Sequence, residues 1–467
     1  MATIINQLLL DSGLALSAID LMEGENPNDV LIKINAILKE AQPLLTDECC
    51  IYRVPHEIRK FKEDAYTPKV VSIGPFHHGD PKLLKMEGLK RTCCREFIER
   101  SEKKNLKSFV SCVQELEAKV RGCYSDEIKL SEEEHVMVIL VDCCFILEFL
   151  LRHHFKLPYS DDIFLSPRLG TYIRYDLLML ENQVPFFVLE KLYNLAFPST
   201  LNSGGRESHP SLLRLALRYI VPSRIVPCDN NNDELTLVDV GRIAHFTDLT
   251  RKSLLRSSHL LQPSTSGCSR EAKLTQLYSN VGLIQPNPNT TELNEAGVKF
   301  EVHKTSQCLL DLELSGHTLK IPFIRVMDST EVILRNLLAF EQCHYIHESY
   351  LTDYAAVFDF LINTEKDVDF FVKNGIIENW IGDSNAVAEM FNGLGVNVVH
   401  PNINTQYLRI CEELNAFCNH PWNRKVATLR RDYCNTPWKT VASIAGIFLL
   451  ILTIIQTVFS ILQVILA

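Results

Sequence analysis

The chain has 467 residues, of which 46% are hydrophobic and 22% are charged, and its formal net charge is −10. A chain of this length and composition is able to bury a large core. The acidic balance excludes general nucleic-acid binding, which requires a basic face, so no nucleic-acid partner is expected. Basic residues between positions 82 and 107 are interleaved with acids, which is typical of a solvated helix face.

The first 45 residues predict a helical lead-in and not a targeting segment. Residues 1–21 lack the basic start of a secretory signal and are interrupted by Asp11 and Asp20. Ala2 stands where N-myristoylation requires a glycine. A mainly helical domain is then predicted over residues 46–422.

Apolar periodicity in that domain predicts helices over residues 81–100, 136–151, 176–195, 212–220 and 249–261. The second of these is apolar almost all round but contains Asp142 and Glu148, so it is predicted to be a central core helix. A short strand is predicted at residues 70–73. Polar clusters predict loops at residues 199–210, 227–233 and 262–270.

The fifteen cysteines favour a structural interpretation. They form no CxxC motif and include three adjacent pairs, at positions 49–50, 93–94 and 143–144. Adjacent side chains on a helix diverge, whereas zinc ligands must converge. The pattern therefore indicates small buried side chains in a reducing compartment. Cys434 differs because it lies next to the predicted membrane surface, which makes it a candidate for palmitoylation.

The most distinctive local sequence surrounds three polar residues, Glu181, Asn182 and Gln183, with large apolar ones. Pro185 lacks an N–H and would clash with the carbonyl of Glu181 in a continuous helix, so a kink or a restart is predicted. Under one hypothesis, these polar groups bind a ligand or a partner. Under the alternative, which we favour, they satisfy one another and the broken helix within the core.

A β-hairpin is predicted within residues 308–323. A two-residue turn at Ser315-Gly316 would place Leu312 opposite Leu319 and Asp311 opposite Lys320, matching apolar with apolar and acid with base. Such a hairpin is evidence of local fold and gives no information about function.

Cap and stop signals divide the region after the hairpin into further helices. Ser329 is predicted to cap a helix that begins at Thr330, and an apolar segment follows at residues 354–361. Thr364 and Asp367 resemble a capping box, Asn374-Gly375 is a stop signal, and the next helix is predicted to open at Asp383 or Ser384. The predicted fold class is therefore mainly α with a small β-hairpin element: one irregular helical domain plus one C-terminal transmembrane helix.

The C-terminal region has the composition of a membrane anchor. Residues 441–467 contain no Asp, Glu, Lys, Arg or His, and a helix of that length exceeds the ~30 Å hydrocarbon thickness of a bilayer. The preceding basic juxtamembrane segment, residues 423–440, is predicted to lie at the membrane interface through Arg430, Arg431, Trp438 and Lys439. Thr436 and Pro437 are typical of a helix start. The positive flank predicts that the N-terminal domain is cytosolic.

Searches for catalytic chemistry find only weak candidates. Glu132 with His135, and Glu341 with His344, have the E-x-x-H spacing of metal-binding helices, and His344 with His347 is a second helical pair. The sequence around His77 and His78 is more typical of a turn. No phosphate-binding, dinucleotide-binding or G-x-S-x-G motif is present. We therefore predict no catalytic residue, no metal site and no cofactor.

Five segments together resemble one protein family. They are residues 51–55, 68–79, 180–189, 295–300 and 336–344, and their order resembles that of the plant domain of unknown function 247. The resemblance implies a plant protein with one C-terminal span, usually assigned to the plasma membrane. Some relatives are implicated in self-incompatibility between pollen and stigma.

These observations predict a membrane-tethered, non-enzymatic interaction protein that acts in recognition or signalling. Its expected partners are the lipid bilayer and a protein of unknown identity. An uncharacterised membrane-bound enzyme, with or without a metal, is the alternative.

Overall fold

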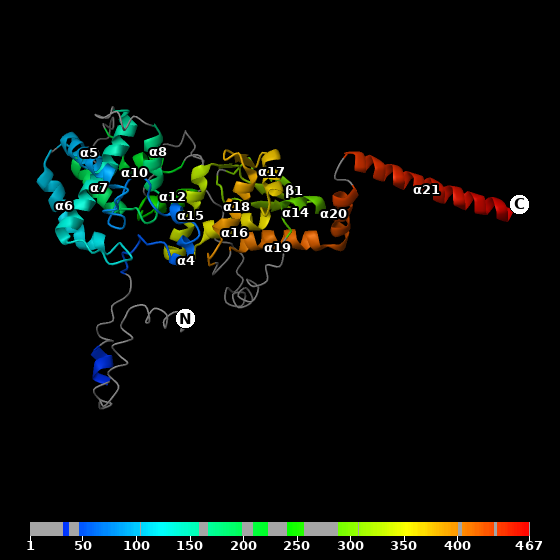
Figure 1. Cartoon of the computed structure of the whole chain (residues 1–467), viewed down its shortest axis with the longest axis horizontal. Helices are drawn as coiled ribbons and strands as arrows, with labels where there is room; N and C mark the ends of the chain where they lie inside the picture. Colours follow the sequence, from blue (N-terminus) through cyan, green and yellow to red (C-terminus); the bar gives the residue numbers. More distant parts are fainter. Residues whose placement is uncertain are drawn as a thin grey trace. The chain divides into compact units, whose positions relative to one another are not determined.

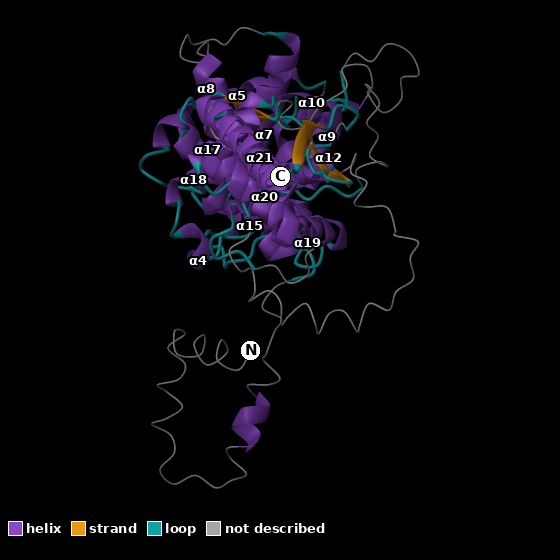
Figure 2. Ribbon diagram, turned by 90° about the vertical axis from the view of Figure 1, so that its right-hand side faces the viewer, coloured by secondary structure: helices purple, strands orange, loops and turns teal. Residues whose placement is uncertain are grey.

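The computed structural model describes residues 31–36, 46–102, 104–157, 167–198, 209–222, 241–255, 288–306, 308–399, 404–433 and 437–466. Contacts divide the chain into two units, residues 1–47 and 48–467. The description below concerns the second unit, in which helices predominate and strands are few and short (Figure 2). This architecture confirms the predicted fold class.

The first half of this unit is built around the long helix α7 (Glu132–Phe155). Helices α5 (Glu87–Arg100), α6 (Leu106–Arg121), α9 (Phe186–Ala196) and α10 (Leu212–Tyr219) all contact α7 (Figure 1). Helix α7 begins with a capping box between Ser131 and Glu134 and is buried along most of its length. The prediction of a central core helix is therefore confirmed, with an additional turn at each end.

Shorter elements complete this half of the unit. They are α4 (His56–Arg59), the 3₁₀ turns η1 (Glu63–Ala65) and η2 (Leu84–Met86), and α8 (Pro167–Asp176). The helix expected over residues 81–100 is preceded by η2, so its α-helical part starts only at Glu87.

The second half contains the helices α12 (Phe246–Leu255), α14 (Thr290–Ala296), α15 (Asp328–His344), α16 (Tyr350–Leu361), α17 (Glu365–Lys373), α18 (Ser384–Leu394), α19 (Thr405–Asn419) and α20 (Pro421–Tyr433). The Thr364–Asp367 capping box and the cap at Asp383 are confirmed. The predicted cap at Ser329 is wrong: α15 begins at Asp328, and the Thr330 hydroxyl accepts a hydrogen bond from the Met327 N–H at 2.9 Å.

Within the described residues, five short strands form two small sheets. Strands β1 (Lys299–Val302), β3 (Thr318–Ile321) and β2 (Glu313–Ser315) lie in that order, β1 parallel and β2 antiparallel to β3. Strands β4 (Ile324–Val326) and β5 (Ile377–Asn379) form a parallel pair. The hairpin prediction is confirmed as an element, and a third strand that the sequence analysis did not predict extends it.

The predicted hairpin register is wrong by two residues. Ser315 pairs with Thr318, so the turn consists of Gly316 and His317, and Glu313 lies opposite Lys320 with their side chains 2.8 Å apart. Gly316 has φ +61°, and a tight hairpin turn requires positive φ at its first central position, where glycine fits best. Because side chains alternate with period two, this shift keeps every residue on its predicted face.

Two predictions between residues 70 and 195 are also corrected. Residues 70–73 form no strand, because side chains rather than a neighbouring strand accept their N–H groups. The helix expected over residues 176–195 is helical only in its second part, since α8 ends at Asp176 and α9 begins at Phe186. Pro185 stands immediately before α9, where its missing N–H costs no helical hydrogen bond. The predicted break is therefore confirmed, and it is longer than expected.

All three adjacent cysteine pairs are buried, as the sequence analysis predicted. Helix α10 matches its predicted range to within one residue. Helix α12 starts three residues before its predicted range. Residues 256–261, most of the predicted loop segments, and Cys434 with Thr436 lie outside the described residues.

Candidate functional site

The segment between α8 and α9 carries Glu181, Asn182 and Gln183 into the interior, where all three are buried. The Asn182 amide donates to the carbonyls of Val71 and Asp176, each at 3.0 Å, and its oxygen accepts from the Ile73 N–H at 2.7 Å. Asn182 thereby uses both ends of its amide group on backbone partners. It joins the break between the helices to the segment at residues 71–73.

Gln183 also binds the backbone of the segment between α8 and α9. Its amide donates to the carbonyls of Leu177 and Met179 at 2.7 and 2.8 Å, and its side-chain oxygen accepts from the Phe246 N–H at 3.1 Å. Its backbone carbonyl accepts from the Tyr124 hydroxyl at 3.0 Å. The side chain therefore satisfies carbonyls that the interrupted helix leaves without an intrahelical partner.

Asp176 holds the neighbouring segment, and sequence reasoning did not identify it. Its carboxylate accepts from the N–H groups of Lys69, Val70 and Val71 at 2.7–2.9 Å. Burial raises the pKa of Asp176 to about 6, although the three N–H donors act in the opposite direction. Asp176 stood at the start of the helix predicted over residues 176–195, a position that gave no signal for these contacts.

A buried ion pair completes this set of contacts. Asp142 of α7 accepts from the Gly74 N–H at 2.8 Å and lies 2.5 Å from the ammonium group of Lys90 on α5. Lys90 also donates to the Ser72 carbonyl at 2.8 Å. Burial raises the pKa of Asp142, opposed by Lys90. An acid in a helix that is apolar almost all round was a signal for such a buried partner.

Gly74 shows how closely this region is packed. It has φ +71°, and a Cβ atom at that position would lie 2.4 Å from the Gln183 carbonyl oxygen. Only glycine fits both the conformation and the space. We refer to Lys90, Asp142, Asp176, Glu181, Asn182 and Gln183 as the buried polar network.

Glu181 is the member of the buried polar network that reaches closest to charged surface residues. One carboxylate oxygen accepts from the Val54 N–H at 2.9 Å and from Arg59 at 2.7 Å. The other lies 3.0 Å from His77 Nε2 and 3.7 Å from Arg53 Nη1. Burial alone would raise the pKa of Glu181, but His77, Val54 and Arg59 together lower it. His77 lies in a turn, as the sequence predicted, and its contact with Glu181 was not predicted.

The second oxygen of Glu181 is chemically distinct from the first. Among the described residues, no donor makes a well-aligned hydrogen bond to it, and the same holds for His77 Nε2. The arrangement places a carboxylate, an imidazole and the half-exposed guanidinium of Arg53 within reach of one another. Asp142 Oδ1 also lacks a well-aligned hydrogen bond, although the Lys90 ammonium group lies 2.5 Å from it.

The residues considered as candidate metal ligands make other interactions. Both Glu341 oxygens are used, one by Arg251 at 2.9 Å and the other by the N–H and hydroxyl of Thr352. His344 bonds to the Tyr52 hydroxyl at 2.9 Å, and α15 ends there, so His344 and His347 are not a helical pair.

In the other E-x-x-H pair, one residue is buried and the other is exposed. His135 is buried with its Nδ1 2.8 Å from Glu117, whereas Glu132 is exposed. Within the ranges that the structure describes, no group of three or more His, Cys, Asp or Glu side chains is arranged to hold a metal ion.

The C-terminal helix α21 (Pro437–Leu466) has the opposite character. Its segment Trp438–Gln463 has a mean hydropathy of 2.4, and none of its most apolar window is buried within the protein. It is long enough and apolar enough to cross a membrane. Helix α21 begins at Pro437, as predicted.

The four predicted interface residues lie on both sides of the junction between α20 and α21. Trp438 is exposed at the first turn of α21, with Lys439 next to it. On α20, Arg431 lies 3.3 Å from Asp432, and Arg430 donates to the carbonyls of Asn294 and Glu295 at 3.1 and 3.2 Å. Arg430 therefore also attaches α20 to the C-terminal end of α14.

These features define a mainly helical protein with a tightly packed buried polar network and a candidate membrane-spanning helix near its C-terminus. A family model described as a plant protein of unknown function, DUF247, matches residues 51–452. The chain belongs to this family, as the sequence resemblance predicted.

Two relatives from Arabidopsis thaliana extend this result. The chain is 30% identical to UPF0481 protein At3g47200 over 438 residues, which cover 89% of the chain and 87% of the relative. It is 24% identical to the putative UPF0481 protein At3g02645, with 87% and 89% covered. No solved structure matches the chain.

Proposed function

We propose that this protein is a membrane-tethered, non-enzymatic interaction protein that acts in recognition or signalling at the plasma membrane, with its N-terminal domain in the cytosol. The observation that carries the proposal is the exposed apolar segment Trp438–Gln463. Water solvates such a surface poorly, and the hydrocarbon core of a bilayer solvates it well.

The proposed orientation rests on charge. Arg424, Lys425, Arg430, Arg431 and Lys439 precede the span, with Asp432 as the one acid among residues 424–439. An excess of Lys and Arg on one flank favours the cytosolic side for that flank. The long N-terminal domain would then remain in the cytosol.

The interaction role rests on tethering. A domain confined to a membrane meets partners on the same surface at high effective concentration, so weak contacts are sufficient. Asn182 and Gln183 bind the protein's own backbone, and Glu341, a candidate metal ligand, binds Arg251 and Thr352. That use favours a structural role for them and leaves the protein surface for binding.

The test compares the full-length protein with a variant that ends at residue 440. The truncated variant is expected to be soluble, to keep the fold of the helical domain, and to lose proximity labelling of membrane partners in living cells. Labelling of the same partners by the soluble variant would contradict the requirement for a tether. In sealed right-side-out vesicles the domain is expected to resist protease until the membrane is permeabilised, and cleavage in intact vesicles would reject the orientation.

A membrane-bound enzyme is the second candidate, and the Glu181–His77 contact is the observation in its favour. A carboxylate with an unused oxygen beside an imidazole is a suitable acid–base pair. Metal analysis of the purified full-length protein tests the metal-dependent form of this idea. A stoichiometric ion that is lost in Glu181→Gln would support it, and its absence from the unmodified protein would end it.

A further inference from the structure

Helix α20 is exposed at most of its positions. None of its residues is buried, and Trp422, Leu429 and Tyr433 are 69%, 49% and 56% exposed. With the half-buried Val426, these residues follow a spacing of four, three and four, so they lie on one face of the helix. A soluble surface rarely displays a continuous stripe of large apolar side chains.

A different face of α20 is attached to the domain. Arg430 donates to carbonyls at the end of α14, and Asn423 donates to the Phe417 carbonyl of α19 at 2.9 Å. Positions 423 and 430 are two helical turns apart and share a face. Because α20 is fixed through that face, the apolar stripe is held outward and is not packed on α14.

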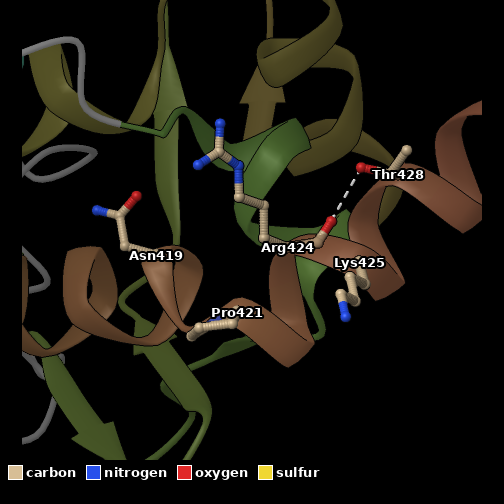
Figure 3. Close-up of a pocket in the computed structure, with 5 residues that line it drawn as sticks. All are labelled: Asn419, Pro421, Arg424, Lys425 and Thr428. Atoms are coloured by element: carbon tan, nitrogen blue, oxygen red, sulfur yellow. Dashed lines mark hydrogen bonds between the residues drawn. The ribbon is translucent and has the colours of Figure 1, made fainter.

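One cation borders the stripe and lines a pocket. Lys425 is three residues after Trp422 and four before Leu429, so it neighbours both. Together with Asn419, Pro421, Arg424 and Thr428, it lines a pocket at the corner between α19 and α20 (Figure 3). This corner is also the start of α20, where the helix dipole adds positive potential. The pocket therefore suits an anionic group such as a phosphate.

Chain continuity brings this surface to the proposed membrane anchor. Only residues 434–436 separate α20 from α21, and a link of that length spans at most about 14 Å. The Ser443 hydroxyl on α21 donates to the Tyr433 carbonyl at 3.1 Å. The end of α20 is thus held next to the first turns of the candidate span.

We propose that α20 lies on the membrane surface as an interfacial helix and selects anionic phospholipid. In this arrangement Trp422, Leu429 and Tyr433 enter the headgroup region, while Lys425, which borders the stripe, contacts lipid phosphates. The inference rests on the proposed membrane tether and deepens it by naming the lipid class and the contact residues. An aromatic and aliphatic stripe bordered by cations is the composition of helices that bind such interfaces.

The test follows the three tryptophans of the chain, at positions 380, 422 and 438, one at a time. Full-length protein with Trp380→Phe and Trp438→Phe is reconstituted into vesicles containing brominated phosphatidylcholine, with and without phosphatidylserine. Fluorescence of Trp422 is expected to be quenched, and more strongly with phosphatidylserine. A variant that keeps only Trp380, which lies next to β5 in the domain, is the unquenched control.

A variant that keeps only Trp438 separates the two possible failures. If Trp438 is quenched and Trp422 is no more quenched than Trp380, the membrane tether stands and the inference about α20 is overturned. If Trp438 is not quenched either, the tether itself is rejected.

Charge reversal tests the lipid selectivity. In the Trp422-only protein, Lys425→Glu is expected to abolish the additional quenching produced by phosphatidylserine. Lys373→Glu, an exposed change on α17, is the matched control and is expected to leave that increment unchanged. Equal quenching in both kinds of vesicle, unaffected by Lys425→Glu, would overturn the selection of anionic lipid.

Discussion

In most proteins polar groups face water and apolar groups are buried, and the buried polar network and helix α21 depart from this rule in opposite ways. In the network, charged and amide groups are buried, and backbone N–H groups, carbonyls and an ion pair replace their water. In α21, isoleucine, leucine and phenylalanine are exposed along the helix. The first region supplies a polar environment inside the protein, whereas the second requires an apolar environment outside it.

The comparison shows where each region's stability comes from. A buried charge depends on a few specific partners, so the loss of one partner is costly. An exposed apolar helix depends on its solvent as a whole, so under the proposed tether a change there is expected to alter membrane insertion and to leave the fold of the domain intact. The predictions below test this contrast, from the largest expected effect to the smallest.

Removal of the network's cation should have the largest effect. Lys90→Met leaves Asp142 buried without its counter-ion, which typically costs about 3–5 kcal/mol of unfolding free energy. Urea denaturation of the full-length protein in detergent measures the change. Lys85→Met, an exposed change on η2, is the matched control and should shift the midpoint little. A loss for Lys90→Met no larger than for this control would show that the ion pair is not structurally important.

A charge placed in α21 should act on insertion instead. Ile451→Arg lies near the middle of the segment Trp438–Gln463 and should cost about 2.5–3.5 kcal/mol of insertion free energy. Carbonate extraction of membranes is expected to release more of this variant, while urea denaturation of its helical domain is expected to be unchanged. If instead the domain loses stability and the membrane fraction does not change, the helix is part of the core.

Asp176→Asn should have an intermediate effect on stability. Asparagine offers one acceptor oxygen, so at least one of the Lys69, Val70 and Val71 N–H groups would lose its partner. An unsatisfied buried donor costs about 1–3 kcal/mol. The measurement is the urea midpoint at neutral pH, and an unchanged midpoint would show that these contacts contribute little.

The same substitution should remove a pH dependence. Burial raises the pKa of Asp176 from 3.8 to about 6, so the folded protein binds this proton more tightly than the unfolded chain does. Its contribution to the unfolding free energy is then greatest below about pH 4 and falls as the pH rises to about 6. Asp176→Asn should lack this decrease, which urea titrations across that range would reveal.

The smallest effect is expected at the hairpin. Glu313 and Lys320 are partly exposed, and such pairs contribute about 0.2–1 kcal/mol. A double-mutant cycle with Glu313→Gln and Lys320→Gln should give a coupling within that range. The corresponding cycle with Asp311→Asn should give none, since Asp311 accepts from Ser306. Coupling to Asp311 instead would restore the register expected from the sequence.

The sequence by itself determined the elements whose signals are local. A periodic apolar pattern and a few caps were sufficient for α7, α10, α17 and α18. The absence of ionisable residues after position 440 was sufficient for the candidate span. In each case the physical cause acts within a few helical turns, or depends only on the solvent around one helix.

Only the tertiary structure decided which distant groups meet. The partners of the Asp176 carboxylate lie at least 105 residues away in sequence. Those of the Asp142 carboxylate lie at least 52 residues away. No local pattern specifies such pairs. The hairpin register depended on which turn position accepts positive φ. The outward stripe of α20 depended on which of its faces binds α14. Local propensity assigns similar free energies to several of these arrangements. Long-range packing selects among them, because burial and hydrogen bonding are satisfied only in the assembled fold.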